Sequence, residues 1–258
     1  MSPISAKDIA ELRARTGVSI SACKEALDEA HGDQEKAIEL LRKRGIAQAA
    51  KKASRDQAEG CVFTAEAPGK AATVLIRCET DFVARDTAFQ SIGTELAQTI
   101  VSKGLAAAEK IASEKIPELV QKLGENISVG EAHLVEAPVI GVYLHSNAKI
   151  AVAIGMEGGN RDMARDAAMH AAAMSPLYVH PEEAPTGTLE KEREIWKEQL
   201  AKEGKPAQIV DKILIGKEKK YREENALLTQ PFAKDPSKTV GQYLGDAKVV
   251  SYIRLSVG

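Results

Sequence analysis

The sequence predicts an α+β protein with a mainly antiparallel sheet. Short apolar runs are separated by turn signals such as Pro68-Gly69, which is typical of strands joined in a hairpin. Longer segments with helical periodicity lie before, between and after these runs. The strands follow one another in pairs rather than in regular strand–helix–strand crossovers, and this order favours α+β over a parallel α/β sheet.

Residues 1–56 predict a small helical module. Ser5, Ser19 and Asp33 each stand before a segment with helical periodicity, where N-cap residues are preferred. We expect the third helix to end at Gly45, and the basic segment after it to form a connector or a fourth helix. Three short helices of this kind resemble a ubiquitin-associated (UBA) domain.

The centre of the chain predicts two core subdomains, one covering residues 57–139 and the other covering 140–180 plus 229–258. We expect a short helix and a last strand to complete the second subdomain, with a loop at 230–232 before them. Pro117 predicts a break or a new start in its helix. The predicted strands are 61–66, 71–78, 129–135, 139–145, 149–156 and 249–257, and the predicted core helices are 87–103, 105–123 and the Ala-rich segment up to residue 174.

The chain partly repeats itself at an offset of 80 residues. Residues 84–90 resemble residues 164–170, and an apolar run precedes each copy. Both copies predict a strand, a polar corner and an Ala-rich helix, as two related subdomains on a shared sheet would have. The corners differ, because Phe82 in the first falls on Asp162 in the second. If Phe82 packed under its own helix in a way common to both units, the second copy should also carry an apolar residue at this place, so we expect Phe82 to be displayed.

Residues 181–228 predict an inserted, coiled-coil-like antiparallel helical hairpin. Two strongly charged helical segments are joined by a short turn at Gly204-Lys205-Pro206. The apolar face of this hairpin is thin. Two interpretations remain: the hairpin folds against the core, or it is an arm that packs on a partner.

Composition excludes several classes of protein. The net charge of −2 and the 4% aromatic content argue against phosphate-neutralising and base-stacking nucleic-acid binders. Three widely spaced cysteines form neither a metal nor a disulfide pattern, which fits a reducing compartment. We expect no membrane span, because no apolar run is long enough, and no secretory signal, because the first helix begins near Met1. We therefore expect a cytoplasmic protein.

Catalytic signatures are missing from the sequence. Gly69-Lys70-Ala71 lacks the other residues of a phosphate loop, and Gly155 to Gly159 lacks dinucleotide-binding spacing. We therefore expect no enzyme activity, no cofactor and no metal, and a protein that works by binding another protein. Two other classes remain as alternatives: an enzyme that uses His145 or His170, and a ubiquitin-like binding adaptor built on the helical module.

Several motifs resemble the elongation factor Ts family, in the same order and over nearly the whole chain. Residues 12–19 with 23–27 are similar to its amino-terminal signature, and Cys78-Glu79-Thr80-Asp81-Phe82-Val83-Ala84-Arg85 to its second signature. Shorter matches lie at 124–127, 143–145, 230–232 and 236–241. Longer family members add a carboxy-terminal helical module after the last strand, so we expect no contacts of that module here.

The resemblance implies guanine nucleotide exchange on elongation factor Tu, a GTPase. In this hypothesis the chain binds the GDP form, displaces Mg²⁺ and GDP, and is released when GTP binds. The hairpin would form a homodimer, bind the GTPase, or do both. The resemblance implies that the residues that dislocate Mg²⁺ on the partner are Thr80, Asp81, Phe82 and Val83. It implies that the other partner-binding residues are Lys24, His145, Phe232, Ala233 and Lys234.

Overall fold

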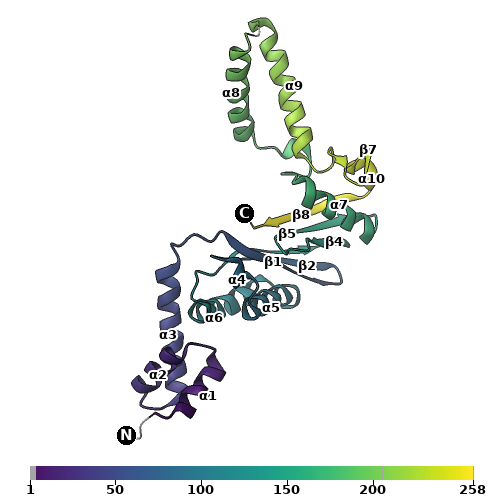
Figure 1. Cartoon of the computed structure of the whole chain (residues 1–258). Coiled ribbons are helices and arrows are strands. Elements are labelled where there is room, and N and C mark those ends of the chain that lie inside the picture. Colours follow the sequence, from purple (N-terminus) through teal and green to yellow (C-terminus); the bar gives the residue numbers. More distant parts are fainter. Residues whose placement is uncertain (1–3, 205, 258) are drawn as a thin grey trace. The chain divides into compact units, whose positions relative to one another are not determined.

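The computed structural model describes residues 4–204 and 206–257 (Figure 1). The chain divides into two compact units. Unit 1 comprises Met1–Leu134, Leu144–Ala151 and Leu255–Gly258, and unit 2 comprises Val135–Tyr143 and Val152–Arg254. Helices and antiparallel strands occur together, which confirms the predicted α+β class.

Unit 1 holds a helical part and a sheet covered by helices. Its helices are α1 (Ala6–Thr16), α2 (Ile20–Glu29), α3 (Gln34–Lys52), α4 (Asp81–Ala84), α5 (Thr87–Lys103) and α6 (Leu105–Leu123). Its strands are β1 (Glu59–Ala67), β2 (Lys70–Cys78) and β3 (Ser128–Glu136), the last of which ends two residues past the border of the unit. The strands lie in the order β1-β2-β3, and α5 and α6 cover one face (Figure 1). Strands β1 and β2 pair antiparallel from Glu59↔Cys78 to Ala67↔Lys70, so the hairpin predicted at Pro68-Gly69 is confirmed.

The three predicted N-caps are confirmed. The Ser5 hydroxyl accepts a hydrogen bond from the Asp8 amide at 3.2 Å, and the Asp8 carboxylate accepts one from the Ser5 amide at 3.0 Å. Ser19 caps α2 and Asp33 caps α3 through their side-chain oxygens. Local hydrogen bonds therefore define where each of these helices begins.

Two helices continue past residues that were expected to end them. Helix α3 runs through Gly45 to Lys52, and α6 runs through Pro117 to Leu123, so both predictions were wrong. A Cβ atom on Gly45 would lie 3.0 Å from the Pro117 carbonyl oxygen. The glycine therefore lets α3 approach α6 closely at that proline, and tertiary packing outweighs the local preferences of both residues.

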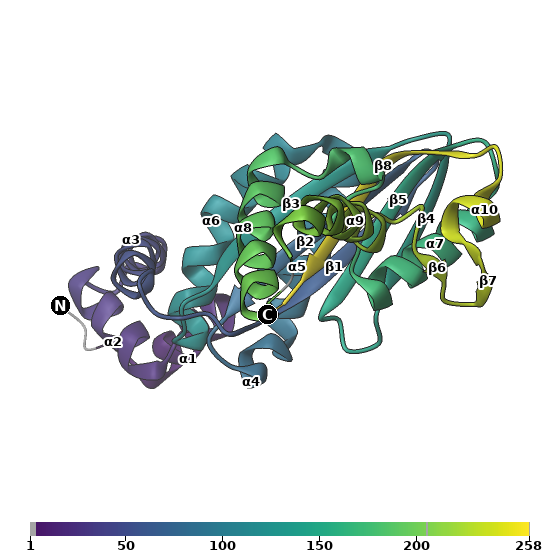
Figure 2. The same ribbon diagram turned by 90° about the horizontal axis from the view of Figure 1, so that it is seen from above.

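Unit 2 contains a second sheet, a small ribbon and two long charged helices. Its strands are β4 (Val139–Leu144), β5 (Ile150–Glu157), β6 (Pro231–Phe232), β7 (Asp235–Thr239) and β8 (Lys248–Ser256), of which β4, β5 and β8 cross the border with unit 1. Its helices are α7 (Arg161–Met174), η1 (Pro181–Glu183), α8 (Thr186–Lys202), α9 (Ala207–Asn225) and α10 (Val240–Leu244). The sheet order is β4-β5-β8, so the last strand joins the second sheet as expected. The loop predicted at 230–232 was wrong in part, because Pro231 and Phe232 form β6, which pairs antiparallel with β7. Figure 2 shows this ribbon and α10 beside α7.

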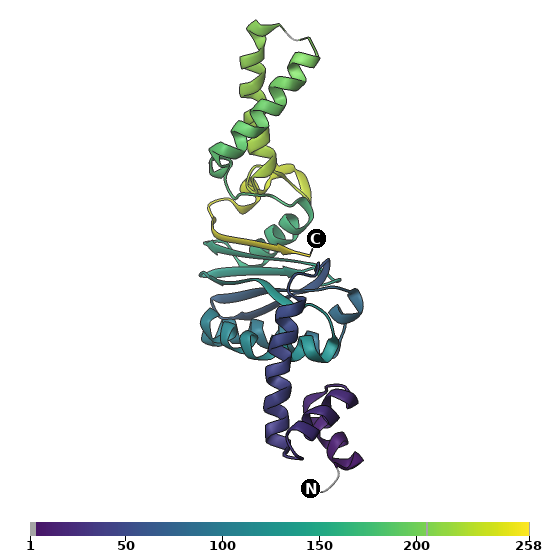
Figure 3. The same cartoon turned by 90° about the vertical axis from the view of Figure 1, so that its left-hand side faces the viewer.

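Helices α8 and α9 pack on each other through a small apolar cluster. Trp196, Leu200 and Leu214 are buried there, and the Trp196 and Tyr221 rings meet edge to face at 5.9 Å. Figure 3 shows the two helices (green) side by side. Among the described side chains of this pair, the large apolar ones that stay exposed are Ile195, Ile209 and Ile215.

Candidate functional site

Two helix starts in close succession form the corner that follows β2. Thr80 caps the four-residue helix α4, its hydroxyl accepting a hydrogen bond from the Val83 amide at 3.4 Å. Asp86 then caps α5 by accepting from the Ala88 amide at 2.8 Å. Phe82 lies between the two caps and is 82% exposed, as expected.

The backbone of this corner is held by a carboxylate that sequence reasoning missed. Glu125 accepts hydrogen bonds from the amides of Glu79 and Thr80, both at 3.0 Å, and from the Thr80 hydroxyl at 2.5 Å. In return, Glu79 accepts from the Asn126 amide at 2.6 Å, and this bond is the main cause that lowers the pKa of the Glu79 carboxyl. The sequence offers one signal for Glu125, because segment 124–127 is one of the shorter matches to the family that the sequence resembles, but that match does not indicate what Glu125 binds.

The inner side of the corner is buried. Val83 and Ala84 belong to the core cluster of unit 1. The Cys78 thiol donates to the Thr80 carbonyl at 3.2 Å, and burial raises the pKa of this thiol to about 12, so it stays protonated. Gln90 Nε2 donates to the Ala84 carbonyl at 2.6 Å. The corner therefore rests on a packed base.

The outer side of the corner presents an aromatic ring beside a carboxylate. Asp81 forms an exposed ion pair with Arg85 at 3.0 Å. Such a pair contributes little to folding. Because the backbone beneath it is fixed and Phe82 is exposed, the corner displays a large apolar side chain in a defined place.

The remaining predicted site residues lie on other elements. Lys24 is exposed on α2, and His145 follows β4, half-buried, with Nδ1 2.9 Å from Asn147 Oδ1. Phe232 is only 2% exposed and stacks on Tyr243, with ring centroids 4.3 Å apart. In the turn after Phe232, the side chains exposed to solvent are Ala233 and Lys234.

The structure therefore brings together only part of the predicted set. Thr80, Asp81, Phe82 and Val83 form one corner in unit 1. Lys24 and His145 lie elsewhere in unit 1, and the segment 232–234 belongs to unit 2. The Phe232 side chain is packed inside unit 2.

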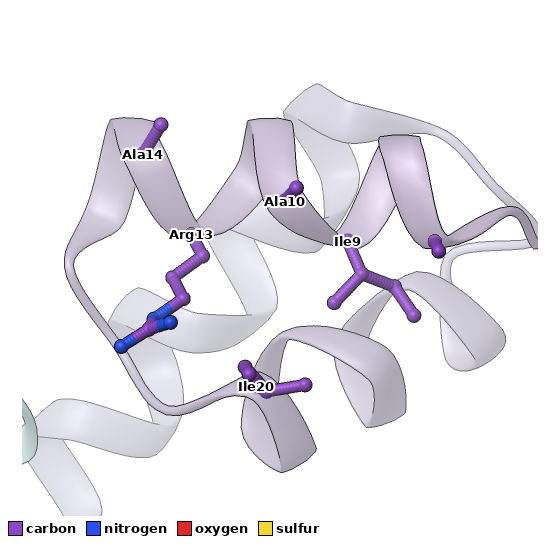
Figure 4. A pocket seen from close by; sticks show the side chains of 6 residues that line it. Ile9, Ala10, Arg13, Ala14 and Ile20 are labelled. Atoms are coloured by element: carbon purple, nitrogen blue, oxygen red, sulfur yellow. The ribbon is translucent and has the colours of Figure 1, made fainter.

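An apolar groove lies between α1 and α2 (Figure 4). Its volume is about 530 Å³, and Ile20 is largely exposed at its edge. Arg13 adds a cation to a lining that is otherwise small or apolar. The residues that line the groove are Ala6, Ile9, Ala10, Arg13, Ala14 and Ile20. Ile9 is half-buried: it packs against the core of the helical module and also lines this groove.

Over 4–204 and 206–257, no helix combines the length and the apolar content that crossing a membrane requires. In the same ranges, no group of three or more His, Cys, Asp and Glu side chains is arranged to hold a metal ion. The three cysteines, Cys23, Cys61 and Cys78, are buried free thiols.

The chain is similar to known proteins over its full length. The family described as elongation factor TS matches residues 79–258. A protein named elongation factor Ts from Francisella tularensis subsp. novicida (strain U112) is 42% identical over 270 aligned positions, covering 100% of this chain and 93% of the relative. A protein of the same name from Marinobacter nauticus is 43% identical over 266 positions, covering 100% of this chain and 92% of the relative. These matches show that the chain belongs to the elongation factor Ts family.

Proposed function

We propose that the chain is a guanine nucleotide exchange factor of translation elongation that acts on elongation factor Tu. Its family membership supports this, and the exposed Phe82 on a fixed corner is the observation that carries it. An exchange factor needs no catalytic chemistry of its own. It needs only to bind the nucleotide-free GTPase more tightly than the nucleotide-bound form, and by reciprocity GTP or GDP then weakens its binding by the same factor.

In this proposal the corner acts as a wedge with a rigid base. The Phe82 ring enters an apolar slot of the GTPase, and Asp81 disturbs the Mg²⁺ site that helps to hold GDP. Thr80 and Val83 hold the corner in place from its buried side, because Thr80 binds Glu125 and Val83 packs in the core of unit 1. Because the corner is ordered before binding, little conformational entropy is lost when the wedge enters.

The other parts of the chain serve as docking surfaces. We propose that residues 1–56 form a UBA-like module that contacts the GTPase through Lys24 and the α1–α2 groove, and that His145 contacts another face. Residues 57–139, and 140–180 with 229–258, form two related core subdomains in this proposal. At the β6–β7 turn, Ala233 and Lys234 make the contact while Phe232 supports them from inside.

Helices α8 and α9 form the inserted hairpin of residues 181–228 in this proposal. Their shared apolar cluster holds the pair together, and Ile195, Ile209 and Ile215 remain exposed for a partner. That partner is a second copy of the chain, the GTPase, or both in turn.

The experiment that tests the proposal is the release of fluorescent GDP from elongation factor Tu with and without the chain. Phe82→Ala should slow the stimulated release about 30-fold or more, because an interface anchor in a desolvated slot carries about 2 kcal/mol or more. Asp162→Ala is the matched control, since Asp162 is exposed at the corresponding place of the second corner. Undiminished release with Phe82→Ala would remove the wedge.

The role of Asp81 can be separated in the same assay. Asp81→Ala should slow release mainly when Mg²⁺ is present, because its proposed task is to disturb the ion. Its effect and that of Phe82→Ala should be non-additive, since the two side chains act on one site. Equal slowing by Asp81→Ala with and without Mg²⁺ would contradict the proposed action on the ion.

A further inference from the structure

His170 lies inside unit 2 with both ring nitrogens in hydrogen bonds. It stands on α7 and is 1% exposed. Its Nδ1 accepts a hydrogen bond from the Ala233 amide at 3.1 Å, and its Nε2 lies 2.9 Å from Gln230 Oε1. The first of these bonds reaches the exposed turn between β6 and β7.

These partners define the protonation state of the ring. The Ala233 amide can only donate, so Nδ1 must be unprotonated. Gln230 Nε2 donates to the Glu224 carbonyl at 2.7 Å, which leaves Oε1 to accept from His170. The proton of the imidazole is therefore on Nε2, and the ring is neutral. A second proton on Nδ1 would face the Ala233 N–H and replace a hydrogen bond by repulsion.

Burial favours this neutral form: it lowers the pKa of His170 and outweighs the hydrogen bond with Gln230, which raises it. Asp166, one turn earlier on α7, is engaged by the Lys234 amine and by the Tyr243 hydroxyl at 3.0 Å. Glu224 of α9 takes part through its main-chain carbonyl. The Phe232 ring lies beside the imidazole, with centroids 6.0 Å apart.

We infer that His170 is a positioning residue: its neutral ring holds the Ala233 amide and thereby sets the turn that presents Ala233 and Lys234. Asp166 holds the Lys234 amine from the same face of α7. The inference rests on the proposed function, in which this turn contacts the GTPase. Protonation of His170 releases the turn while the rest of unit 2 stays folded, so the contact is pH-sensitive.

Two substitutions separate the halves of the ring. In His170→Asn the side-chain oxygen can take the place of Nδ1 and accept from Ala233, but it cannot be protonated. In His170→Gln the amide can take the place of Nε2 and reach Gln230, but it leaves the Ala233 amide without an acceptor. A role in packing alone would affect both variants alike.

The first measurement is the hydrogen-exchange protection factor of the Ala233 amide in the full chain. At pH 7.5 we expect this amide to be protected in wild type and in His170→Asn. In His170→Gln its protection factor should fall about tenfold, which corresponds to the loss of one hydrogen bond of about 1.4 kcal/mol. As the pH is lowered to 5, the protection of the wild type should fall and that of His170→Asn should not. Unchanged protection in His170→Gln would overturn the inference.

The second measurement is the dissociation rate of the complex with nucleotide-free elongation factor Tu at pH 7.5. We expect the complex of His170→Gln to dissociate several times faster than that of wild type, and the complex of His170→Asn to dissociate at the wild-type rate. If Ala233 loses protection in His170→Gln while dissociation stays the same, the inference is overturned but the wedge is not, because Phe82→Ala tests the wedge separately.

A third measurement needs no variant. The ¹⁵N chemical shifts of the His170 ring in the wild-type chain report its tautomer and charge. We expect the neutral ring with its proton on Nε2 at pH 7, and protonation only below the ordinary pKa of histidine. A ring protonated on Nδ1 at pH 7 would overturn the inference even if both variants failed to fold.

Discussion

The corners after β2 and β5 begin in the same way and end differently. Thr80 and Asn160, 80 residues apart, both cap a helix by accepting from the amide three residues later, Val83 at 3.4 Å and Met163 at 3.0 Å. In the first corner the helix stops after four residues and a second one begins. In the second corner α7 runs without a break from Arg161 to Met174.

The difference lies in what two later positions hold. In the first copy, Asp86 caps α5 and Gln90 donates to the Ala84 carbonyl, so both side chains stabilise their own corner. In the second copy, the corresponding Asp166 and His170 bind the β6–β7 turn instead. One repeated helix pattern thus supports its own corner in unit 1 and a distant segment in unit 2. In unit 1 the exposed residue, Phe82, accordingly lies in the corner itself. In unit 2 the exposed residues, Ala233 and Lys234, lie in the distant β6–β7 turn.

The largest expected effect concerns a core position of the repeat. Phe89 is fully buried beside Phe63, whereas Met169, its counterpart, is only partly buried. Phe89→Ala should lower the free energy of unfolding by about 3–5 kcal/mol, and Met169→Ala should cost clearly less. Urea titration of both variants measures the difference. Equal costs would mean that the two helices are packed alike after all.

A smaller effect should separate the two caps. Asn160→Ala should lower the free energy of unfolding by about 1 kcal/mol, which is typical for the loss of an N-cap. Thr80→Ala should cost more, about 2 kcal/mol, because it also removes the hydrogen bond to Glu125. Thermal unfolding compares the two variants. A larger loss for Asn160→Ala would contradict the special support assigned to the first corner.

A pH effect should belong to the second copy only. Because burial lowers the pKa of His170, the unfolded chain takes up a proton near pH 6.5 and the folded chain does so only at lower pH. The neutral His170 ring therefore stabilises the folded chain at pH values above its pKa in the unfolded chain. This stabilisation is lost as the pH falls through its pKa in the folded chain. Replacing His170 by Asn should flatten this decline, measured as the free energy of unfolding between pH 7.5 and 5. Gln90→Asn in the first copy should leave the decline unchanged.

The smallest effect on stability is expected at the exposed aromatic. Phe82→Ala should change the free energy of unfolding by no more than about 0.5 kcal/mol, because its side chain is largely exposed in the isolated chain. Calorimetry of the same preparation used for the GDP-release assay makes the comparison direct. Marked destabilisation with normal GDP release would make Phe82 an ordinary core residue.

Features that depend on neighbouring residues could be predicted from the sequence. Caps such as Ser5 and Asp33 act through hydrogen bonds within one turn, and the β1–β2 hairpin follows from apolar runs on both sides of Pro68-Gly69. The display of Phe82 was predictable because the repeat offered an internal comparison, in which Asp162 takes its place. The sequence by itself thus determined the α+β class, most element boundaries and the corner.

Features that depend on distant residues were decided by the tertiary structure. Gly45 stays helical because α3 approaches α6 there, and Phe232 is buried because Tyr243 and α7 surround it. Glu125 holds the corner from 45 residues away, and His170 reaches an amide 63 residues later in the chain. Such partners leave no periodic or local pattern, since each hydrogen bond depends on where the fold brings a single donor and acceptor together.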